Sequence, residues 1–132
     1  MDDVFHITPD RERASDLFVM SKERISMLKL IPKNMTYRIV EEYYEIIKEL
    51  LTAVMYIDGY KTLSHVELIG YFSSHCKDLD EQQIRLVDDI RKQRHGIVYY
   101  GKKIRKEFLI NHEEEIAKII KILMAVVEKR LK

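Results

Sequence analysis

Apolar residues recur at helical spacing along the first half of the chain. A first helix is predicted from near Thr8, because Pro9 suits the first turn of a helix, and Pro32 ends it. One face of this helix carries Ala14, Leu17, Phe18, Ser21, Ile25 and Leu28. A second helix, predicted from residues 34–36 to residues 58–59, has an apolar stripe that is too wide for a lightly packed surface helix. We therefore do not expect this second helix to be a lightly packed helix at the surface.

Start signals mark the helices of the second half. Ser64 with Glu67, and Asp80 with Gln83, have the spacing of capping boxes, so helices are predicted over about 64–76 and 80–101. Asn111 and the acidic residues after it mark the start of a last helix, whose apolar face includes Ile116, Ile119, Ile120, Leu123 and Val127. The pattern leaves residues 102–110 open, either as helix or as loop.

These elements predict an all-α protein, an up-and-down antiparallel bundle of four to five helices. Short connections between amphipathic helices favour antiparallel neighbours. Hydrophobic residues make up 46% of the chain and charged residues 34%, which is typical of a folded protein, and four Gly and two Pro leave few breaks. At 132 residues, we expect one domain over 1–132, with residues 1–8 as a flexible tail.

Features of the whole chain indicate a cytoplasmic protein. Cys76 is the only cysteine, so an internal disulfide is excluded, and we expect this thiol to be buried and inert. The first residues do not have the pattern of a secretory signal, and no stretch reaches the roughly 18 to 20 apolar residues that span a bilayer. The formal net charge of +1 carries no information about partners, so any electrostatic argument must be local.

One segment, residues 91–100, is not explained by folding. On a helical wheel Arg94 falls inside the apolar arc of the fourth helix, where a guanidinium is costly unless it is paired or faces a cleft. Arg91, His95 and Tyr99 form a second stripe beside it, and Asp88 lies one turn earlier. Polar side chains that could bind or catalyse therefore project from one edge of one helix.

The same segment begins a basic run. Between residues 91 and 106 the chain has no acidic residue and seven basic ones: Arg91, Lys92, Arg94, Lys102, Lys103, Arg105 and Lys106. Tyr99 and Tyr100 lie among them. Cations that hold phosphates, with aromatic faces on which bases stack, indicate a surface for single-stranded nucleic acid. The structural alternative is that Arg94 pairs with a carboxylate in the core and that the helix dipole favours the other cations.

Residues 94–101, Arg-His-Gly-Ile-Val-Tyr-Tyr-Gly, resemble the motif of the HEPN superfamily, small helical-bundle proteins of prokaryotes. Members act as toxins, as defence components and as companions of minimal nucleotidyltransferases. Active members carry an Arg, a polar residue and, a few residues later, a His. Arg94 and His95 match the first two positions, whereas Tyr99, followed by Tyr100, stands where the family has its His. The arrangement of helices over about 10–130 is also similar.

The resemblance implies a homodimer in which two motifs share a cleft that holds RNA or a nucleotide, without metal or cofactor. The implied catalytic residues are Arg94, His95 and Tyr99. The implied binding residues are Arg91, Arg94, His95, Tyr99, Tyr100, Lys102 and Lys103. A tyrosine with a pKa near 10 is a poor base at neutral pH, so the motif favours binding over cleavage.

Three hypotheses follow for this chain. The first is a dimeric module that binds RNA or a nucleotide, or docks a nucleotidyltransferase partner, in a toxin–antitoxin or defence system. The second is a metal-independent endoribonuclease toxin in which Tyr99 or His95 replaces the usual His. The third is a structural dimer without a ligand. The remaining histidines, His6, His65, His75 and His112, have no metal-ligand spacing, and Tyr43 and Tyr44 are expected in the core or at a dimer contact.

Overall fold

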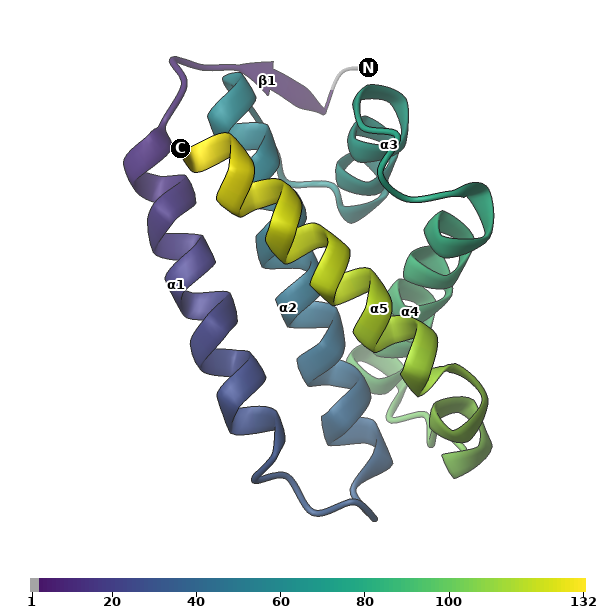
Figure 1. Ribbon diagram of the computed structural model, residues 1–132. Coiled ribbons are helices and arrows are strands. Elements are labelled where there is room, and N and C mark those ends of the chain that lie inside the picture. Colours follow the sequence, from purple (N-terminus) through teal and green to yellow (C-terminus); the bar gives the residue numbers. More distant parts are fainter. Residues whose placement is uncertain (1–2) are drawn as a thin grey trace.

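The computed structural model describes residues 3–132, which form five helices and one two-stranded sheet. In chain order the elements are β1 (Val4–His6), α1 (Arg11–Leu28), α2 (Thr36–Asp58), β2 (Tyr60–Thr62), α3 (His65–His75), α4 (Glu81–Tyr100) and α5 (Lys106–Leu131). Figure 1 shows α1, α2 and α5 together, with α3 and α4 beside them. The prediction of an all-helical bundle is confirmed.

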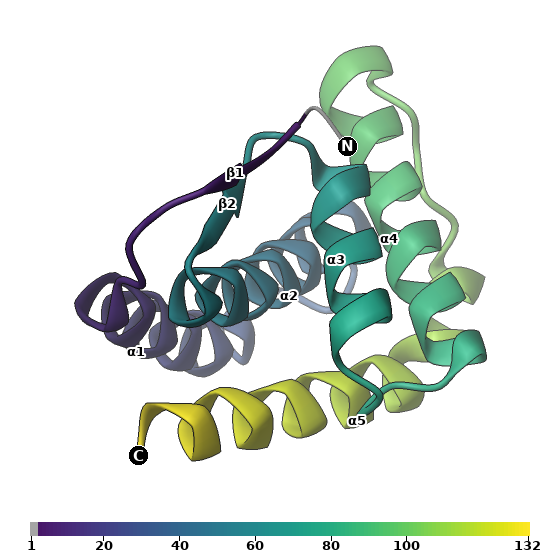
Figure 2. The ribbon, with the colours of Figure 1, turned by 90° about the horizontal axis from the view of Figure 1, so that it is seen from above.

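Helix α2 is the centre of the bundle. It contacts all four other helices, and in Figure 2 it lies between α1 on one side and α3 and α4 on the other. Its wide apolar stripe is buried accordingly: Ile46, Ile47, Leu50, Ala53 and Val54 are completely inaccessible to solvent. Each large apolar side chain contributes about 1.5–3 kcal/mol when it is fully buried. The rest of the bundle is therefore organised around this helix.

The predicted caps set most of the helix ends. The Ser64 hydroxyl accepts the backbone N–H of Glu67, and Asp80 and Gln83 form a reciprocal capping box. Gly59 ends α2 with a φ of 88°, and Gly101 ends α4 with a φ of 60°. A glycine adopts this left-handed conformation without steric strain, which explains why both helices end where they do.

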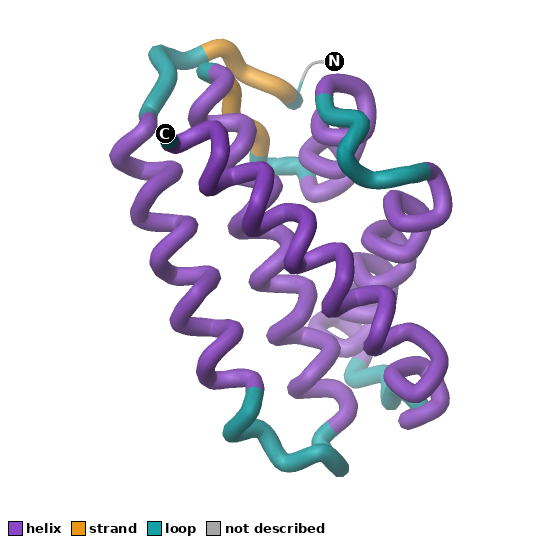
Figure 3. The backbone as a smooth tube through the Cα atoms, in the orientation of Figure 1, coloured by secondary structure: helices purple, strands orange, loops and turns teal. Residues whose placement is uncertain are grey.

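The N-terminal segment differs from the predicted flexible tail. Met1 and Asp2 lie outside the described residues, but Val4–His6 form β1, which pairs antiparallel with Tyr60–Thr62 (Figure 3). The following residues also bond to the end of α2: Ile7 N–H donates to the Gly59 carbonyl at 2.8 Å. Because of these bonds α1 begins at Arg11, with Asp10 as its N-cap, and not near Thr8.

Helix α5 begins earlier than its sequence signals indicate. Residues 102–105 are a loop and Lys106 is the first helical residue, so Asn111 lies inside the helix and caps nothing. The N-cap residue Arg105 makes no side-chain capping bond. Leu109 is buried and Phe108 packs against the core, so packing sets this helix start. Within residues 3–132, no helix is both long and apolar enough to cross a membrane.

Candidate functional site

Arg94 projects from α4 toward the central helix. Its Nη2 donates to the Oε1 of Glu45 on α2 at 3.1 Å, and its side chain is 24% exposed. The guanidinium carbon lies 5.6 Å from the centre of the buried Tyr44 ring, within the range of a cation–π contact. The helical wheel therefore placed Arg94 correctly on the inward side of α4, where a carboxylate and an aromatic ring compensate its charge.

Arg91 is held one turn before Arg94 by an acidic neighbour on the same helix. Its Nε donates to the Oδ1 of Asp88 at 2.7 Å, and Lys92 lies 3.4 Å from the other oxygen of that carboxylate. The hydrogen bond from Arg91 lowers the pKa of Asp88, so this carboxylate stays ionised at neutral pH. Asp88 thus orients Arg91 and neutralises part of the local charge.

A cavity of about 270 Å³ lies between the start of α3 and the last turns of α4, which run side by side in Figure 2. Its lining residues are Leu63, Ser64, His65, Val66, Arg91, Arg94, His95 and Tyr99. None of these is a carboxylate, whereas two are guanidiniums and two are imidazoles. The N-terminal end of α3, which has positive partial charge, also borders the cavity. The lining itself is therefore electropositive, while Asp88 and Glu45 pair with its two arginines from outside the lining, and its remaining N–H donors suit an anion.

His65 is the residue of this cavity that the sequence did not indicate. Its Nδ1 and the Tyr44 hydroxyl are 2.8 Å apart in a hydrogen bond. Burial, followed by the nearby charges of Lys48 and Arg94, lowers the pKa of His65, and burial raises the pKa of Tyr44 to about 12. His65 is therefore neutral at neutral pH. The capping box at Ser64 predicted that His65 lies at the start of α3. No sequence signal showed that α3 faces α4.

Aromatic rings extend the cavity toward solvent. The His95 ring lies 4.6 Å from the Tyr99 ring and 5.9 Å from the Tyr100 ring, measured between centroids. Tyr99 is 66% exposed and Tyr100 is 77% exposed, so most of each phenol faces solvent. Exposed aromatic faces beside cations are the features on which single-stranded bases stack.

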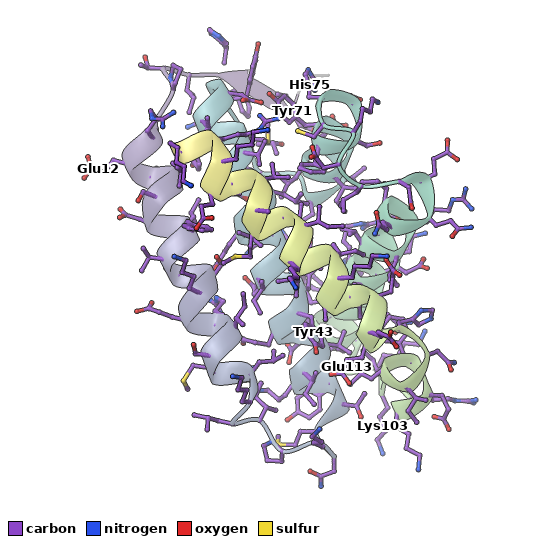
Figure 4. The ribbon with its side chains drawn as sticks, in the orientation of Figure 1. Glu12, Tyr43, Tyr71, His75, Lys103 and Glu113 are labelled. Atoms are coloured by element: carbon purple, nitrogen blue, oxygen red, sulfur yellow. The ribbon has the colours of Figure 1, made fainter. Side chains whose placement is uncertain are left out.

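Lys102 and Lys103 lie apart from these residues. They border a second cavity, of about 510 Å³, with Asn34, Thr36, Tyr37, Ile97, Gly101 and Ile104. Figure 4 shows Lys103 at the end of the bundle where the loop before α5 begins. The structure thus brings Arg91, Arg94, His95 and Tyr99 together, places Tyr100 at their edge, and separates the two lysines from them.

The surroundings of Arg94 bear on its role. The ion pair with Glu45 is what a purely structural role would require, but such a role does not require an open electropositive cavity beside the pair. Glu45 itself is also held by Lys48, at 2.8 Å, so Arg94 is not its only cationic partner. In the described part of the chain, no three His, Cys, Asp or Glu side chains are grouped as metal ligands. The groups available for chemistry are guanidiniums, imidazoles and a phenol.

Comparisons with protein-family models, with curated proteins and with solved structures found no match to this chain.

Proposed function

We propose that this chain is a HEPN-like module that binds single-stranded RNA or a phosphorylated nucleotide in the α3–α4 cavity. The observation that carries the proposal is the lining of that cavity, in which Arg91 and Arg94 meet two imidazoles without a carboxylate. A guanidinium recognises phosphate through several parallel N–H donors. Arg94 uses Nη2 for Glu45, which leaves its other donors for a ligand.

The size of the site supports recognition of a small part of a strand. A volume of about 270 Å³ is at the lower limit for pockets that enclose small molecules, so it suits a phosphate with its sugar. Adjoining bases would stack on Tyr99 and Tyr100, which are exposed next to His95. This division, with phosphate inside and bases on the rim, predicts little dependence on base sequence.

The test is binding of a fluorescent twelve-residue oligouridylate, measured by anisotropy at low salt, with uridine monophosphate as a competing nucleotide. Arg94→Ala should weaken binding at least about tenfold, because hydrogen bonds between charged groups contribute about 1.5–3 kcal/mol. Arg85→Ala is the matched control, since Arg85 lies on the same helix and, among residues 3–132, its exposed side chain pairs with Glu81 alone. Absence of binding by RNA and nucleotide, or equal losses in both variants, would refute the proposal.

The resemblance extends the proposal to partners. A cytoplasmic homodimer would join two α3–α4 cavities in one cleft, beside a minimal nucleotidyltransferase in a toxin–antitoxin or defence system. Sedimentation at micromolar concentration should then give a dimer, and a monomer would contradict the shared cleft. A neighbouring gene for a small nucleotidyltransferase would support the proposed partner.

A second candidate function is metal-independent cleavage of RNA, and the pair of imidazoles in one cavity favours it. Neutral His65 would remove the proton of a ribose 2′-OH, whose oxygen attacks phosphorus. The bond from phosphorus to the 5′-oxygen breaks, and His95 would act as the acid that gives a proton to that oxygen. The products are a 2′,3′-cyclic phosphate and a free 5′-OH, and the guanidiniums stabilise the charge of the intermediate. His65 thus offers the second imidazole that the motif lacks at Tyr99.

Cleavage is tested by incubating the labelled RNA with the protein in excess chelator. His65→Gln and His95→Gln should each slow cleavage by about 10²-fold or more, the usual contribution of a positioned acid or base. His112→Gln is the control, because His112 is half-buried like His65 but lies on α5 and contacts Phe108. Intact RNA after hours with the wild-type protein would exclude this candidate and leave the binding proposal standing.

A further inference from the structure

A groove separates α1 and α5 at the end of the bundle opposite to the chain termini. The two helices are in contact near the termini, where Arg11 Nη2 donates to the Leu131 carbonyl at 2.6 Å, and again at the middle of α1, where Ser21 lies against Met124. Figure 1 shows them diverging from there, with α2 between and behind them. A cavity of about 500 Å³ occupies the place where they have separated.

The walls and floor of this groove are mostly apolar. Ile25 and Leu28 come from α1, Leu109 and Ile110 from α5, and Ile39 of α2 forms part of the floor. Ile110 is 73% exposed, and the neighbouring Leu30, in the loop after α1, is 72% exposed. An apolar groove with exposed side chains at its edge is typical of a surface where another molecule docks.

The rim of the groove carries one sign of charge. Lys29 and Lys33 stand on one side and Lys106 on the other, and within residues 3–132 none of them pairs with a carboxylate. The single carboxylate of the lining, Glu113, accepts the Tyr43 hydroxyl at 2.7 Å, and Figure 4 shows these two side chains meeting between α2 and α5. Among the described residues, the three lysines of the rim therefore have no carboxylate partner.

We propose that the groove binds an amphipathic helix of a partner protein, with an apolar stripe flanked on both sides by Asp or Glu. Two diverging helices over a third leave an apolar groove against which one more helix can pack. The apolar stripe of the partner helix packs on the apolar floor of the groove, as in helix-in-groove recognition. Lysines on opposite rims pair with the acidic residues on the two flanks of that helix. This site shares no residue with the α3–α4 cavity and does not depend on the function proposed for it.

The probe is a labelled sixteen-residue helical peptide with leucines at positions i, i+3, i+4 and i+7 and glutamates on both flanks. Its partner peptide has lysine at every glutamate position and the same leucines. The acidic peptide should bind the full-length protein, as measured by anisotropy, and the lysine peptide should not. Backbone amide shifts in NMR spectra should change at Ile25 and Ile110 and stay unchanged at Ser73 of α3.

Variants of exposed residues test the rim and the floor separately. Lys33→Glu combined with Lys106→Glu should weaken the acidic peptide at least about tenfold, because like charges would then face each other. Lys118→Glu, an equal charge change at an exposed position of α5 outside the groove, should have little effect. Ile110→Ser should also weaken binding, and its high exposure means that the fold is kept.

Each other outcome would overturn the proposal. One is failure of the acidic peptide to bind, or equal binding of both peptides. Another is a dimer in sedimentation that Ile110→Asp dissociates, which would make a second copy the occupant. A third is binding to phosphatidylglycerol vesicles that depends on Lys33 and Lys106 and that the peptide does not displace. Arg94→Ala should leave peptide binding intact, which separates this test from that of RNA binding.

Discussion

Two arginines reach the central helix α2 from neighbouring helices, and their surroundings differ. Arg24 of α1 donates from Nε to Glu49 at 2.9 Å and from Nη1 to Glu42 at 3.0 Å. Arg94 of α4 bonds to the single carboxylate Glu45. Both are partly buried ion pairs between helices. The difference is that two carboxylates satisfy Arg24 on two edges, whereas one carboxylate bonds to Arg94.

The charge around each pair shows the same difference. A shallow hollow next to Arg24 is lined by two arginines and two glutamates, so its charges balance. The α3–α4 cavity next to Arg94 has two arginines and no carboxylate in its lining. An inward arginine is therefore not evidence of a site by itself. Donors left over after the ion pair, and a cavity without a carboxylate in its lining, are what distinguish Arg94.

The largest effect is expected from Arg24→Met. It leaves Glu42 and Glu49 without their main cation, and Glu49 is only 5% exposed with one oxygen already unpaired among the described residues. Breaking such a pair costs about 3 kcal/mol, which urea denaturation should show as a lower free energy of unfolding. RNA binding should persist at temperatures where the variant is folded. A decrease in the free energy of unfolding of less than about 1 kcal/mol would mean that the Arg24 ion pair contributes no more than an ordinary surface pair.

Arg94→Met should cost less stability, about 1 kcal/mol, because Lys48 still holds Glu45 at 2.8 Å. This is measured in the same denaturation experiment, so the two variants form a direct comparison. If Arg94→Met destabilises the fold as much as Arg24→Met, Arg94 is mainly a structural residue. The proposed difference between a structural Arg24 and a ligand-binding Arg94 would then be wrong.

Salt should weaken RNA binding at the α3–α4 cavity but leave the stabilising effect of Arg24 nearly unchanged, and this difference is smaller than the preceding ones. If two phosphates of a single strand contact the α3–α4 cavity, raising salt from 50 to 200 mM should weaken RNA binding about sevenfold. The difference in unfolding free energy between wild type and Arg24→Met should change little, since partly buried pairs are screened less than exposed charges. Arg91→Gln should reduce the salt dependence of binding. RNA binding that does not change with salt would exclude phosphate recognition at the cavity.

The features that followed from local sequence rules were predicted well. The caps at Ser64 and Asp80, the stops at Gly59 and Gly101, and the inward position of Arg94 depend only on spacing along one helix. Amphipathic periodicity likewise predicted that α2 is more than a lightly packed surface helix, because its apolar stripe is wide.

What escaped prediction depends on contacts between distant segments. The pairing of Val4–His6 with Tyr60–Thr62 and the start of α5 at Lys106 are set by packing. His65 enters the cavity only because α3 lies against α4, and the loop after α4 turns Lys102 away from Arg94. In each case a helix wheel shows which face a residue is on but not which neighbour covers that face.

The smallest effect is a pH dependence from His65. Its folded-state pKa is lowered, so the unfolded chain binds its proton more readily, and stability is lost as pH falls below the unfolded value of about 6.5. Urea denaturation between pH 7 and pH 5 should therefore show a larger loss for wild type than for His65→Gln. Removing a nearby cation by Arg94→Met should raise the pKa of His65 and reduce this loss, whereas Arg24→Met should not. Equal pH dependence in wild type and His65→Gln would mean that protonated His65 is tolerated in the cavity.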